Sequence, residues 1–161
     1  MIDQIRKKII ATENLEKLLK VWRLQSQQIV FTNGCFDLLH LGHLSYLAEA
    51  KALGDKLIIG LNADASVSRL KGDHRPINDA ESRAMMLASL QFVDAVTLFE
   101  DDTPLHLITQ ILPNVLVKGG DYTLNQIVGH DVVLGAGGIV KTIPFLEGYS
   151  STNIVSRIKG E

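Results

Sequence analysis

Residues 28–43, which read QIVFTNGCFDLLHLGH, decide the fold of this chain. The first five residues are a short apolar run rich in strand-forming types, and Asn33-Gly34 follows them as a turn. His40 and His43 then flank a glycine at the beginning of an expected helix. The pattern predicts a buried strand that leads through a tight turn into a helix N-terminus.

The same alternation of strands and helices continues toward both ends of the chain. Such alternation indicates a parallel sheet that is covered on both faces. We therefore predict an α/β fold, a single Rossmann-like domain with helices on both faces of a parallel sheet, in which 1–27 form an N-terminal helical segment. Besides 28–32, we expect strands at 56–61, 94–99, 114–118 and 139–143, and helices at 12–25, 42–53, 63–70, 79–90, 103–112 and 151–159.

The helix that begins beside the two histidines offers a site for an anion. A helix N-terminus presents unpaired N–H groups and a partial positive charge, and Gly42 would let the backbone approach a ligand. In parallel sheets ligands bind beyond the carboxyl ends of the strands, which is where His40 and His43 are expected. Spacing alone leaves two alternatives: zinc, which needs further Cys or His ligands, and a Cys35 nucleophile, which needs a partner base.

Composition excludes several classes of protein. The formal net charge of -2 over 161 residues argues against a broad nucleic-acid surface, and no segment approaches the length of a membrane span. The single cysteine excludes an internal disulfide and fits a reducing compartment. We expect a cytoplasmic protein without a signal peptide that binds neither nucleic acid nor membrane. The basic residues Arg69, Lys71, His74 and Arg75 form a local cluster that suits either a phosphate contact or a solvated loop.

Two stretches at opposite ends of the chain resemble a known superfamily. His40-Leu41-Gly42-His43, preceded by 34–39, resembles the H-x-G-H signature of the nucleotidylyltransferases, which include cytidylyltransferases and phosphopantetheine adenylyltransferase. Glu147–Thr152 resembles the element whose hydroxyl groups open the last helix and hold the β- and γ-phosphates, although an ordinary Ser/Thr cap looks the same. The two elements together identify 28–161 as a nucleotidyltransferase domain by resemblance.

Further stretches resemble most closely the adenylyltransferase half of bifunctional ADP-heptose synthases and the stand-alone heptose 1-phosphate adenylyltransferases. The sugar kinase that precedes this domain in the bifunctional relatives is absent here, so we expect the single-function form. Glycerol-phosphate cytidylyltransferases carry an arginine before the last helix, whereas 144–150 has none, which favours adenine over cytosine. The matching stretches are 31–37, 61–67, 70–72 with 75–78, and 117–122.

The resemblance implies an enzyme that transfers AMP from ATP to D-glycero-β-D-manno-heptose 1-phosphate and releases pyrophosphate. The product, ADP-heptose, would serve bacterial lipopolysaccharide. Mg²⁺ would bind through the ATP phosphates, with no protein side chain assigned as its ligand, and the assembly would be a homodimer. Two alternatives remain: a cytidylyl- or adenylyltransferase for another small phosphate, such as glycerol 3-phosphate or FMN, and a catalytically silent nucleotide-binding module.

The resemblance also implies roles for side chains. Asp37 would hydrogen-bond the sugar, although a turn-stabilising role is an alternative, and Arg75 would belong to a lid. Independently of the resemblance, we expect Arg83 to form a surface ion pair, with a phosphate contact as the alternative. Catalytic roles fall to His40, His43, Lys71, Ser151 and Thr152. Nucleotide binding falls to Thr32, Asn33, Gly34, Cys35, Phe36, Gly42, Gly119, Gly120, Ser150, Ser151 and Thr152. Substrate binding falls to Asp37, Lys71, Arg75, Lys118, Asp121 and Tyr122.

Overall fold

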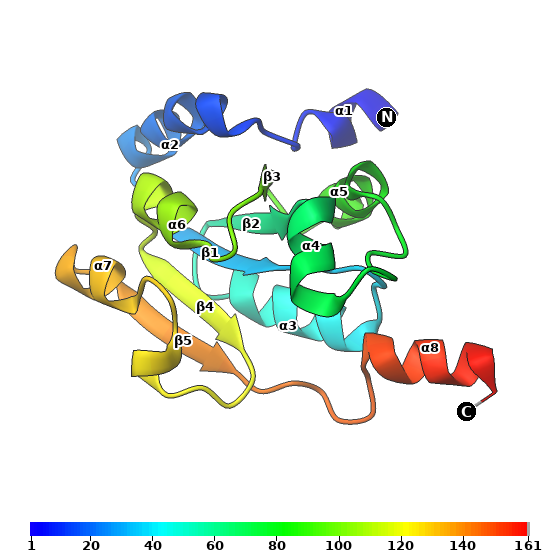
Figure 1. The fold of residues 1–161 in the computed structure, drawn as a ribbon. Coiled ribbons are helices and arrows are strands. Elements are labelled where there is room, and N and C mark those ends of the chain that lie inside the picture. The colour runs from blue at the N-terminus through cyan, green and yellow to red at the C-terminus, as the bar shows by residue number, and fades with distance from the viewer. Residues whose placement is uncertain (161) are drawn as a thin grey trace.

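The computed structural model describes residues 1–160 and has one five-stranded sheet flanked by helices (Figure 1). The strand order is β3-β2-β1-β4-β5, and all the strand pairs are parallel. The predicted α/β class and parallel sheet are therefore confirmed. The strands are β1 (Ile29–Gly34), β2 (Lys56–Asn62), β3 (Ala95–Phe99), β4 (Val115–Gly119) and β5 (Ile139–Ile143). The main helices are α2 (Leu15–Leu24), α3 (Leu41–Lys51), α4 (Asp64–Lys71), α5 (Ala80–Ser89), α6 (Leu105–Ile111) and α8 (Ser151–Lys159).

The strand order reverses between β1 and β4, and this reversal opens a crevice. The strands β2 and β3 lie on one side of β1, whereas β4 and β5 lie on the other. All six residues of β1 pair with β2, but only Val30 and Phe31 pair with β4. Beyond Phe31 the carboxyl end of β1 has lost its partner on the β4 side. Ligands of open α/β sheets bind at this kind of position.

Each face of the sheet has its own apolar core because successive strand residues point to opposite faces. Val30 packs on the face covered by α3 and α5, whereas Ile29 and Phe31 pack on the face covered by α2 and α6. Figure 1 shows α3 and α2 on opposite sides of the sheet. The helical members of the two cores are Tyr46, Leu47, Ala50, Ala84, Leu87 and Ala88 on the first face, and Leu15, Leu19, Trp22, Leu107, Ile108, Ile111 and Val133 on the second.

The N-terminal helical segment belongs to this packed structure. The expected helix at 12–25 is a short 3-10 turn, Thr12–Asn14, followed by α2, and its apolar side chains Leu15, Leu19 and Trp22 are buried against the sheet. The apolar stripe of this helix therefore packs inward. Ile9 forms an isolated parallel bridge with Val96, so the segment also continues the sheet beside β3.

Three short elements were not predicted from the sequence. They are α1 (Ile2–Arg6), a 3-10 turn at Leu124–Gln126, and α7 (His130–Gly135). The helix α7 has six residues, of which only Val133 is buried, so it carries almost no apolar periodicity. The other predicted boundaries agree to within one or two residues, and Asp79 caps α5 as expected, accepting a bond from Ser82 N at 2.7 Å. Within residues 1–160 no helix combines the length and apolar character needed to cross a bilayer.

Candidate active site

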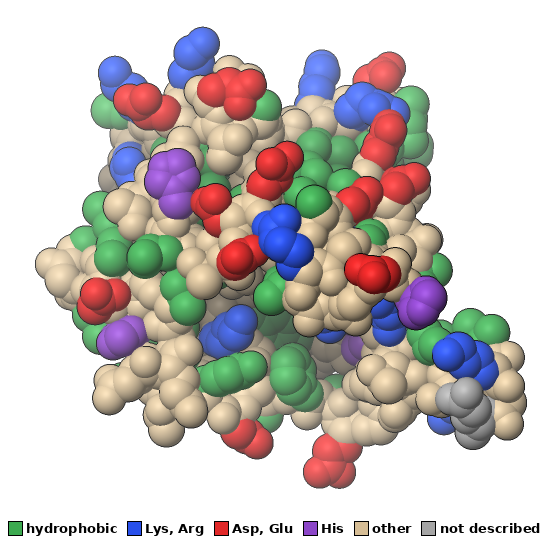
Figure 2. Space-filling model, viewed as in Figure 1, with side chains coloured by type: hydrophobic (Ala, Val, Ile, Leu, Met, Phe, Trp, Pro, Cys, Tyr) green, Lys and Arg blue, Asp and Glu red, His purple; other side chains and the backbone are tan. Residues whose placement is uncertain are grey.

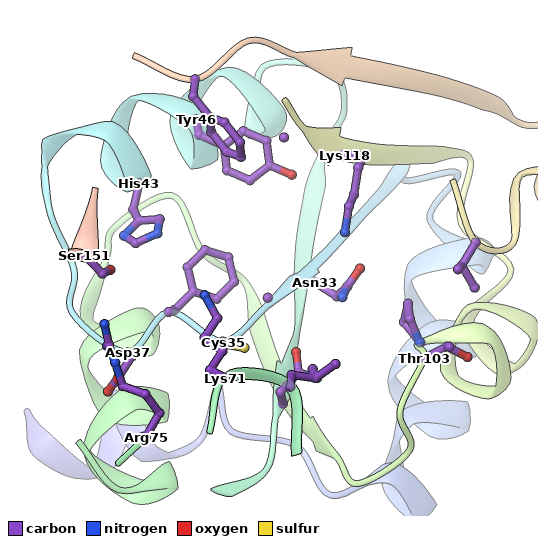
Figure 3. Close-up of a pocket in the computed structure, with 18 of the residues that line it drawn as sticks. Asn33, Cys35, Asp37, His43, Tyr46, Lys71, Arg75, Thr103, Lys118 and Ser151 are labelled. Atoms are coloured by element: carbon purple, nitrogen blue, oxygen red, sulfur yellow. The ribbon is translucent and has the colours of Figure 1, made fainter. Parts of the chain in front are cut away.

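A cavity of about 500 Å³ lies at the carboxyl ends of the strands, over the crevice beside β1 (Figures 2 and 3). Figure 2 shows the hollow with basic and apolar side chains at its margin. Its volume suits a small-molecule ligand. The lining residues are Asn33, Gly34, Cys35, Phe36, Asp37, His43, Tyr46, Asn62, Leu70, Lys71, Arg75, Asp102, Thr103, Pro104, Lys118, Gly119, Tyr122, Val128, Phe145 and Ser151.

The two histidines stack at the beginning of α3. Their ring centroids are 3.8 Å apart, and His40 caps the helix by accepting a bond from His43 N at 3.4 Å. Burial, with a smaller contribution from the neighbouring His40, lowers the pKa of His43 to about 4. The imidazole of His43 is therefore neutral at pH 7, and it can donate an N–H to an anion without carrying a charge of its own.

Gly42 permits a close approach between protein side chains. A Cβ at this position would lie 3.1 Å from the His40 ring and 3.1 Å from the Cβ of Tyr149. The sequence pattern predicted a close approach of the backbone to a ligand at Gly42, whereas the neighbours in the structure are the ring of His40 and the segment that precedes α8. Because Gly42 has no side chain, the loop at His40 can pack against the segment that precedes α8.

The beginning of α8 lies against the histidine loop. Ser151 Oγ donates to the carbonyl of Leu38 at 3.3 Å, and Ser151 and His43 line the same cavity. Ser150 acts as the helix cap, accepting from Asn153 N at 3.0 Å. Thr152 is exposed and does not line the cavity. The structure therefore brings one of the three predicted hydroxyl residues, Ser151, to the cavity beside His43.

Two lysines reach the middle of the cavity from opposite sides. Lys71 extends from the end of α4 and Lys118 from β4, and Figure 3 shows both amines near the carboxyl end of β1. Burial lowers the pKa of Lys118, whose Nζ lies 5.6 Å from the ring centroid of Tyr122. Neither lysine forms an ion pair within residues 1–160. Both charges are therefore available to a bound phosphate.

Cys35 lines the cavity near these lysines. Burial raises the pKa of its thiol, although the charges of Lys71 and Arg83 act in the opposite direction. A thiol with a raised pKa is a poor nucleophile at neutral pH, so the geometry gives no support to covalent catalysis by Cys35.

Asp37 lines the cavity and holds a neighbouring loop. Its oxygens accept bonds from Arg75 at 2.6 Å, Ile77 N at 2.8 and 3.0 Å, and Asn78 N at 2.9 Å. Burial opposes ionisation, but the N–H groups of Asn78 and Ile77 and the Arg75 guanidinium outweigh it and lower the pKa of the carboxyl. Protein donors contact both oxygens, so Asp37 anchors the loop at 75–78, and its bond to sugar hydroxyls stays a prediction.

Arg83 is fully buried, which contradicts the predicted surface ion pair. Its guanidinium donates to the carbonyl of Cys35 at 2.6 Å and of Asn62 at 2.9 Å. It also bonds the carbonyl of Asn78 at 3.0 Å and the carboxylate of Asp64 at 2.7 Å. One side chain thereby ties the ends of β1 and β2 to the segments that border the cavity.

Several predicted residues lie outside the cavity lining. Thr32 is buried in a hydrogen bond with Tyr46, which also donates to the Val117 carbonyl at 3.4 Å, and burial raises the pKa of Tyr46 to about 12. Thr32 is therefore a core residue, and its predicted contact with the nucleotide is wrong. The remaining predicted residues that do not line this cavity are His40, Gly42, Gly120, Asp121, Ser150 and Thr152, of which His40 and Ser150 line a second hollow beside Tyr149.

Sequence reasoning missed several residues of the lining. Asn62 is the last residue of β2 and Thr103 follows β3, so the rule that ligands bind at the carboxyl ends of strands would have found them. Tyr46 and Phe145 carry no such signal, because an aromatic residue in a helix or loop usually indicates packing. Within residues 1–160, no group of three or more His, Cys, Asp or Glu side chains is placed to hold a metal ion.

Comparison with known proteins places this geometry in a family. The model of the family described as cytidylyltransferase-like matches residues 31–157, which include the histidine pair, the cavity and most of α8. The chain belongs to the cytidylyltransferase-like family. The matched residues include both of the elements that meet at the cavity, His40–His43 and the beginning of α8.

This chain is similar to part of several longer proteins. The protein is 53% identical over 150 residues to the bifunctional protein HldE of Nitrobacter hamburgensis and 53% identical over 151 residues to that of Trichlorobacter lovleyi. These matches cover 93% and 94% of this chain but only 31% of each relative. The chain thus spans about a third of the length of these relatives.

Two solved structures have a similar fold. A lipopolysaccharide core biosynthesis protein from Thermoplasma volcanium aligns with a TM-score of 0.60 and 29% identity, covering 77% of this chain and 99% of that one. The pantoate-β-alanine ligase of Francisella tularensis aligns with a TM-score of 0.61 and 18% identity, covering 94% of this chain and 76% of that one. The second likeness supports the fold alone.

Proposed function

We propose that this protein is an adenylyltransferase that joins AMP from ATP to a sugar 1-phosphate and releases pyrophosphate. The proposed acceptor is D-glycero-β-D-manno-heptose 1-phosphate, and the proposed product is ADP-heptose. Support comes from the 53% identity to bifunctional HldE proteins, whose names fit the resemblance to ADP-heptose synthases, and from the likeness to a lipopolysaccharide core biosynthesis protein. A cytoplasmic location, where ATP is made, and a homodimeric assembly belong to the same proposal.

The proposed reaction needs no general base from the protein. An oxygen of the sugar phosphate attacks the α-phosphorus of ATP, and the bond from that phosphorus to the leaving pyrophosphate breaks. A phosphate monoester has its second pKa near about 6, so the attacking oxygen is already ionised at neutral pH. The protein then contributes alignment of the two substrates and stabilisation of the charge that develops on oxygen.

The proposed roles follow the geometry of the cavity. His43 and the N–H groups at the beginning of α3 donate to the polyphosphate from one side. Ser151, at the beginning of α8, faces the same end and holds the departing pyrophosphate. Lys71 and Lys118 neutralise the incoming phosphate in the middle of the cavity. Mg²⁺ enters with ATP, bound to phosphate oxygens, which suits an ion that keeps much of its water.

The observation that carries the proposal is the shared cavity of His43, Ser151 and the two lysines. The direct test measures pyrophosphate release with Mg²⁺ and a panel of ATP, CTP, GTP and UTP, each offered heptose 1-phosphate, glycerol 3-phosphate or FMN. We expect turnover with ATP and heptose 1-phosphate. Turnover with CTP and glycerol 3-phosphate instead would support the cytidylyltransferase alternative, and ATP binding without turnover on any acceptor would indicate a silent module.

Two variants test the proposed catalytic groups. His43→Ala and Lys71→Ala should each lower kcat by a factor of about a hundred or more, because each removes a donor to the transition-state phosphates. Circular dichroism should show an unchanged fold. His106→Ala is the matched control, since this histidine is 82% exposed and lies outside the cavity lining. Full turnover in either active-site variant would remove that residue from the mechanism.

A further inference from the structure

The last helix, α8, buries none of its own residues. Figure 1 shows it at the edge of the molecule, away from α2. A helix of this length is marginal in water unless it packs an apolar face against another surface. The fold of one chain therefore leaves α8 without the cover that such a short helix needs.

The apolar side chains of α8 form a patch that is open to solvent. Ile154 and Ile158 are four residues apart, so they are neighbours along one face of the helix, and Ile158 is 78% exposed. Ile154, Leu41 and Tyr149 line the second hollow, whose volume is about 490 Å³. Figure 2 shows hydrophobic side chains at the surface where α8 lies. An exposed apolar patch beside a hollow is typical of an interaction site.

Two opposite charges border the same hollow. Glu147 precedes α8, Arg157 lies in its last turn, and both line the hollow. Both side chains are exposed, and neither forms an ion pair within residues 1–160. A partner that fits this surface must therefore carry an acidic group, a basic group and an apolar side chain that can enter the hollow.

A second copy of this chain meets all three requirements. In a two-fold symmetric interface the same patch is used twice, so that each residue and its partner exchange places across the axis. The protruding Ile158 of one copy can enter the hollow beside Ile154 of the other, and Glu147 of one copy can pair with Arg157 of the other. The surface thus supplies its own complement.

We propose that α8 and the hollow beside it form the interface between two copies of this chain. This inference deepens the proposed function, since it names the surface of the homodimer that belongs to that proposal. It also involves the active site, because Ser151 stands in the first turn of α8 and its Oγ donates to the Leu38 carbonyl at 3.3 Å. The second copy covers α8 and thereby holds Ser151 at the cavity.

Ile158→Glu tests the interface, because it places a charge where the proposal requires burial. Size-exclusion chromatography with light scattering should show wild-type protein as a dimer at micromolar chain concentrations. The variant should have a dimer dissociation constant that is raised about thirtyfold or more, as for a central interface residue. Leu24→Glu is the matched control, since this leucine is 79% exposed in the last turn of α2. The control should remain dimeric.

Charge reversal tests whether the partner is a second copy. Glu147→Arg and Arg157→Glu should each weaken the dimer about tenfold or more, because each places like charges against one another. Both changes made in one chain should restore the dissociation constant to within about threefold of the wild-type value, since opposite charges then meet again. Failure of the double variant to recover would contradict the proposed pairing.

Turnover tests whether the interface supports the active site. At low protein concentration the kcat of Ile158→Glu should fall about tenfold or more, because Ser151 loses its position, and it should recover as the concentration rises and dimers form. Such recovery excludes misfolding as the cause. Wild-type turnover per chain should not depend on concentration. Full turnover by a monomeric variant would contradict the link between the interface and Ser151.

The outcomes separate this inference from the proposed reaction. A monomeric wild-type protein that turns over heptose 1-phosphate would overturn the interface and leave the reaction standing. A dimer that survives both Ile158→Glu and the single charge reversals uses another surface and would also overturn the inference. If the dimer dissociates as expected but no acceptor is turned over, the interface stands and the proposed reaction fails.

Discussion

Two stacked imidazoles at a helix N-terminus favour an uncharged state before substrate binds. The partial positive charge of α3 and the burial of the rings both oppose protonation, and the nearest ring to His43 is another histidine. An arriving polyphosphate reverses this balance, because it supplies the negative charge that an imidazolium needs. The histidine pair is thus adapted to hold an anion. When no anion is bound, the pair makes the stability of the fold sensitive to acid.

The depressed pKa of His43 predicts how stability changes with pH. The folded protein keeps this ring neutral down to about pH 4, while the unfolded chain takes up the proton near 6.5, the ordinary pKa of a histidine side chain. Between these values the unfolded state binds more protons, so the free energy of unfolding should fall as the pH is lowered from 6.5 toward 4. The loss from one such group is at most about 1.4 kcal/mol per pH unit.

Urea unfolding at several pH values between about 7 and about 4.5 checks this expectation. His43→Asn should flatten the decline relative to wild type, and His106→Asn, at an exposed site, should leave it unchanged. The lowered pKa of Asp37 adds its own acid sensitivity only as the pH falls through the carboxyl range, below most of this window. An equally steep decline in His43→Asn would assign the acid sensitivity to other groups.

Sequence could indicate that His43, Lys71 and Ser151 lie at one site, because His43 and Ser151 stand in the first turn of a helix within a recognisable motif and Lys71 belongs to a local basic cluster. It could not find the partners of Asp37. The partners of that carboxylate, Ile77 and Asn78, are about forty positions away, and nothing in the local pattern places them there. Roles that depend on local motifs are readable from the chain, whereas roles that depend on distant backbone donors need the tertiary structure.

At the level of elements, Arg83 on α5 joins the ends of two strands to the loops of the site. Its bonds to the carbonyls of Cys35 and Asn62 lie where β1 and β2 end, and its bond to Asp64 holds the beginning of α4. The sequence showed only an arginine in a helix, which is usually exposed. Burial of the guanidinium is possible here because four separate acceptors surround it.

Arg83→Met should lower the free energy of unfolding by at least about 2 kcal/mol. The substitution keeps an unbranched apolar stem but leaves the carbonyls of Cys35, Asn62 and Asn78 without this donor, and a buried carbonyl left unpaired costs about 1–3 kcal/mol. Arg6→Met is the matched control, because its ion pair with Glu81 is exposed and should contribute little. Chemical unfolding of both variants provides the measurement. Similar losses in the two proteins would mean that the Arg83 bonds do not organise the site.

The order of elements could be predicted more fully than their partners. Strands such as 139–143 and helices such as 151–159 agree with the structure because strand residues and caps give local signals. The pairing of β1 with only two residues of β4, which opens the crevice, depends on how two strands far apart in the sequence are placed in the sheet, so that they diverge beyond Phe31. No local signal reports such divergence, so the position of the cavity was predictable and its extent was not.

For the whole molecule, we expect the N-terminal segment to decide whether the remainder can fold. Residues 28–161 contain all five strands and the cavity lining, yet one face of their sheet is covered partly by α2. Leu15, Leu19 and Trp22 are each at most 8% exposed. Burying three such side chains contributes roughly 5–9 kcal/mol, which is comparable to the entire stability of a typical domain.

A chain truncated to 28–161 should therefore fail to fold cooperatively. The truncation removes α2 and would expose Ile29, Phe31 and Ile58 to water. The bridge from Ile9 to the β3 edge would also be lost. Removal of residues 1–4 alone is the matched control, because Met1 and Ile2 are 95% and 59% exposed and the bridge is retained. Thermal unfolding followed by circular dichroism distinguishes the two truncations. A sharp transition in the 28–161 protein, near that of the full chain, would show that the sheet and its site stand without α2 and would make 28–161 an independent domain.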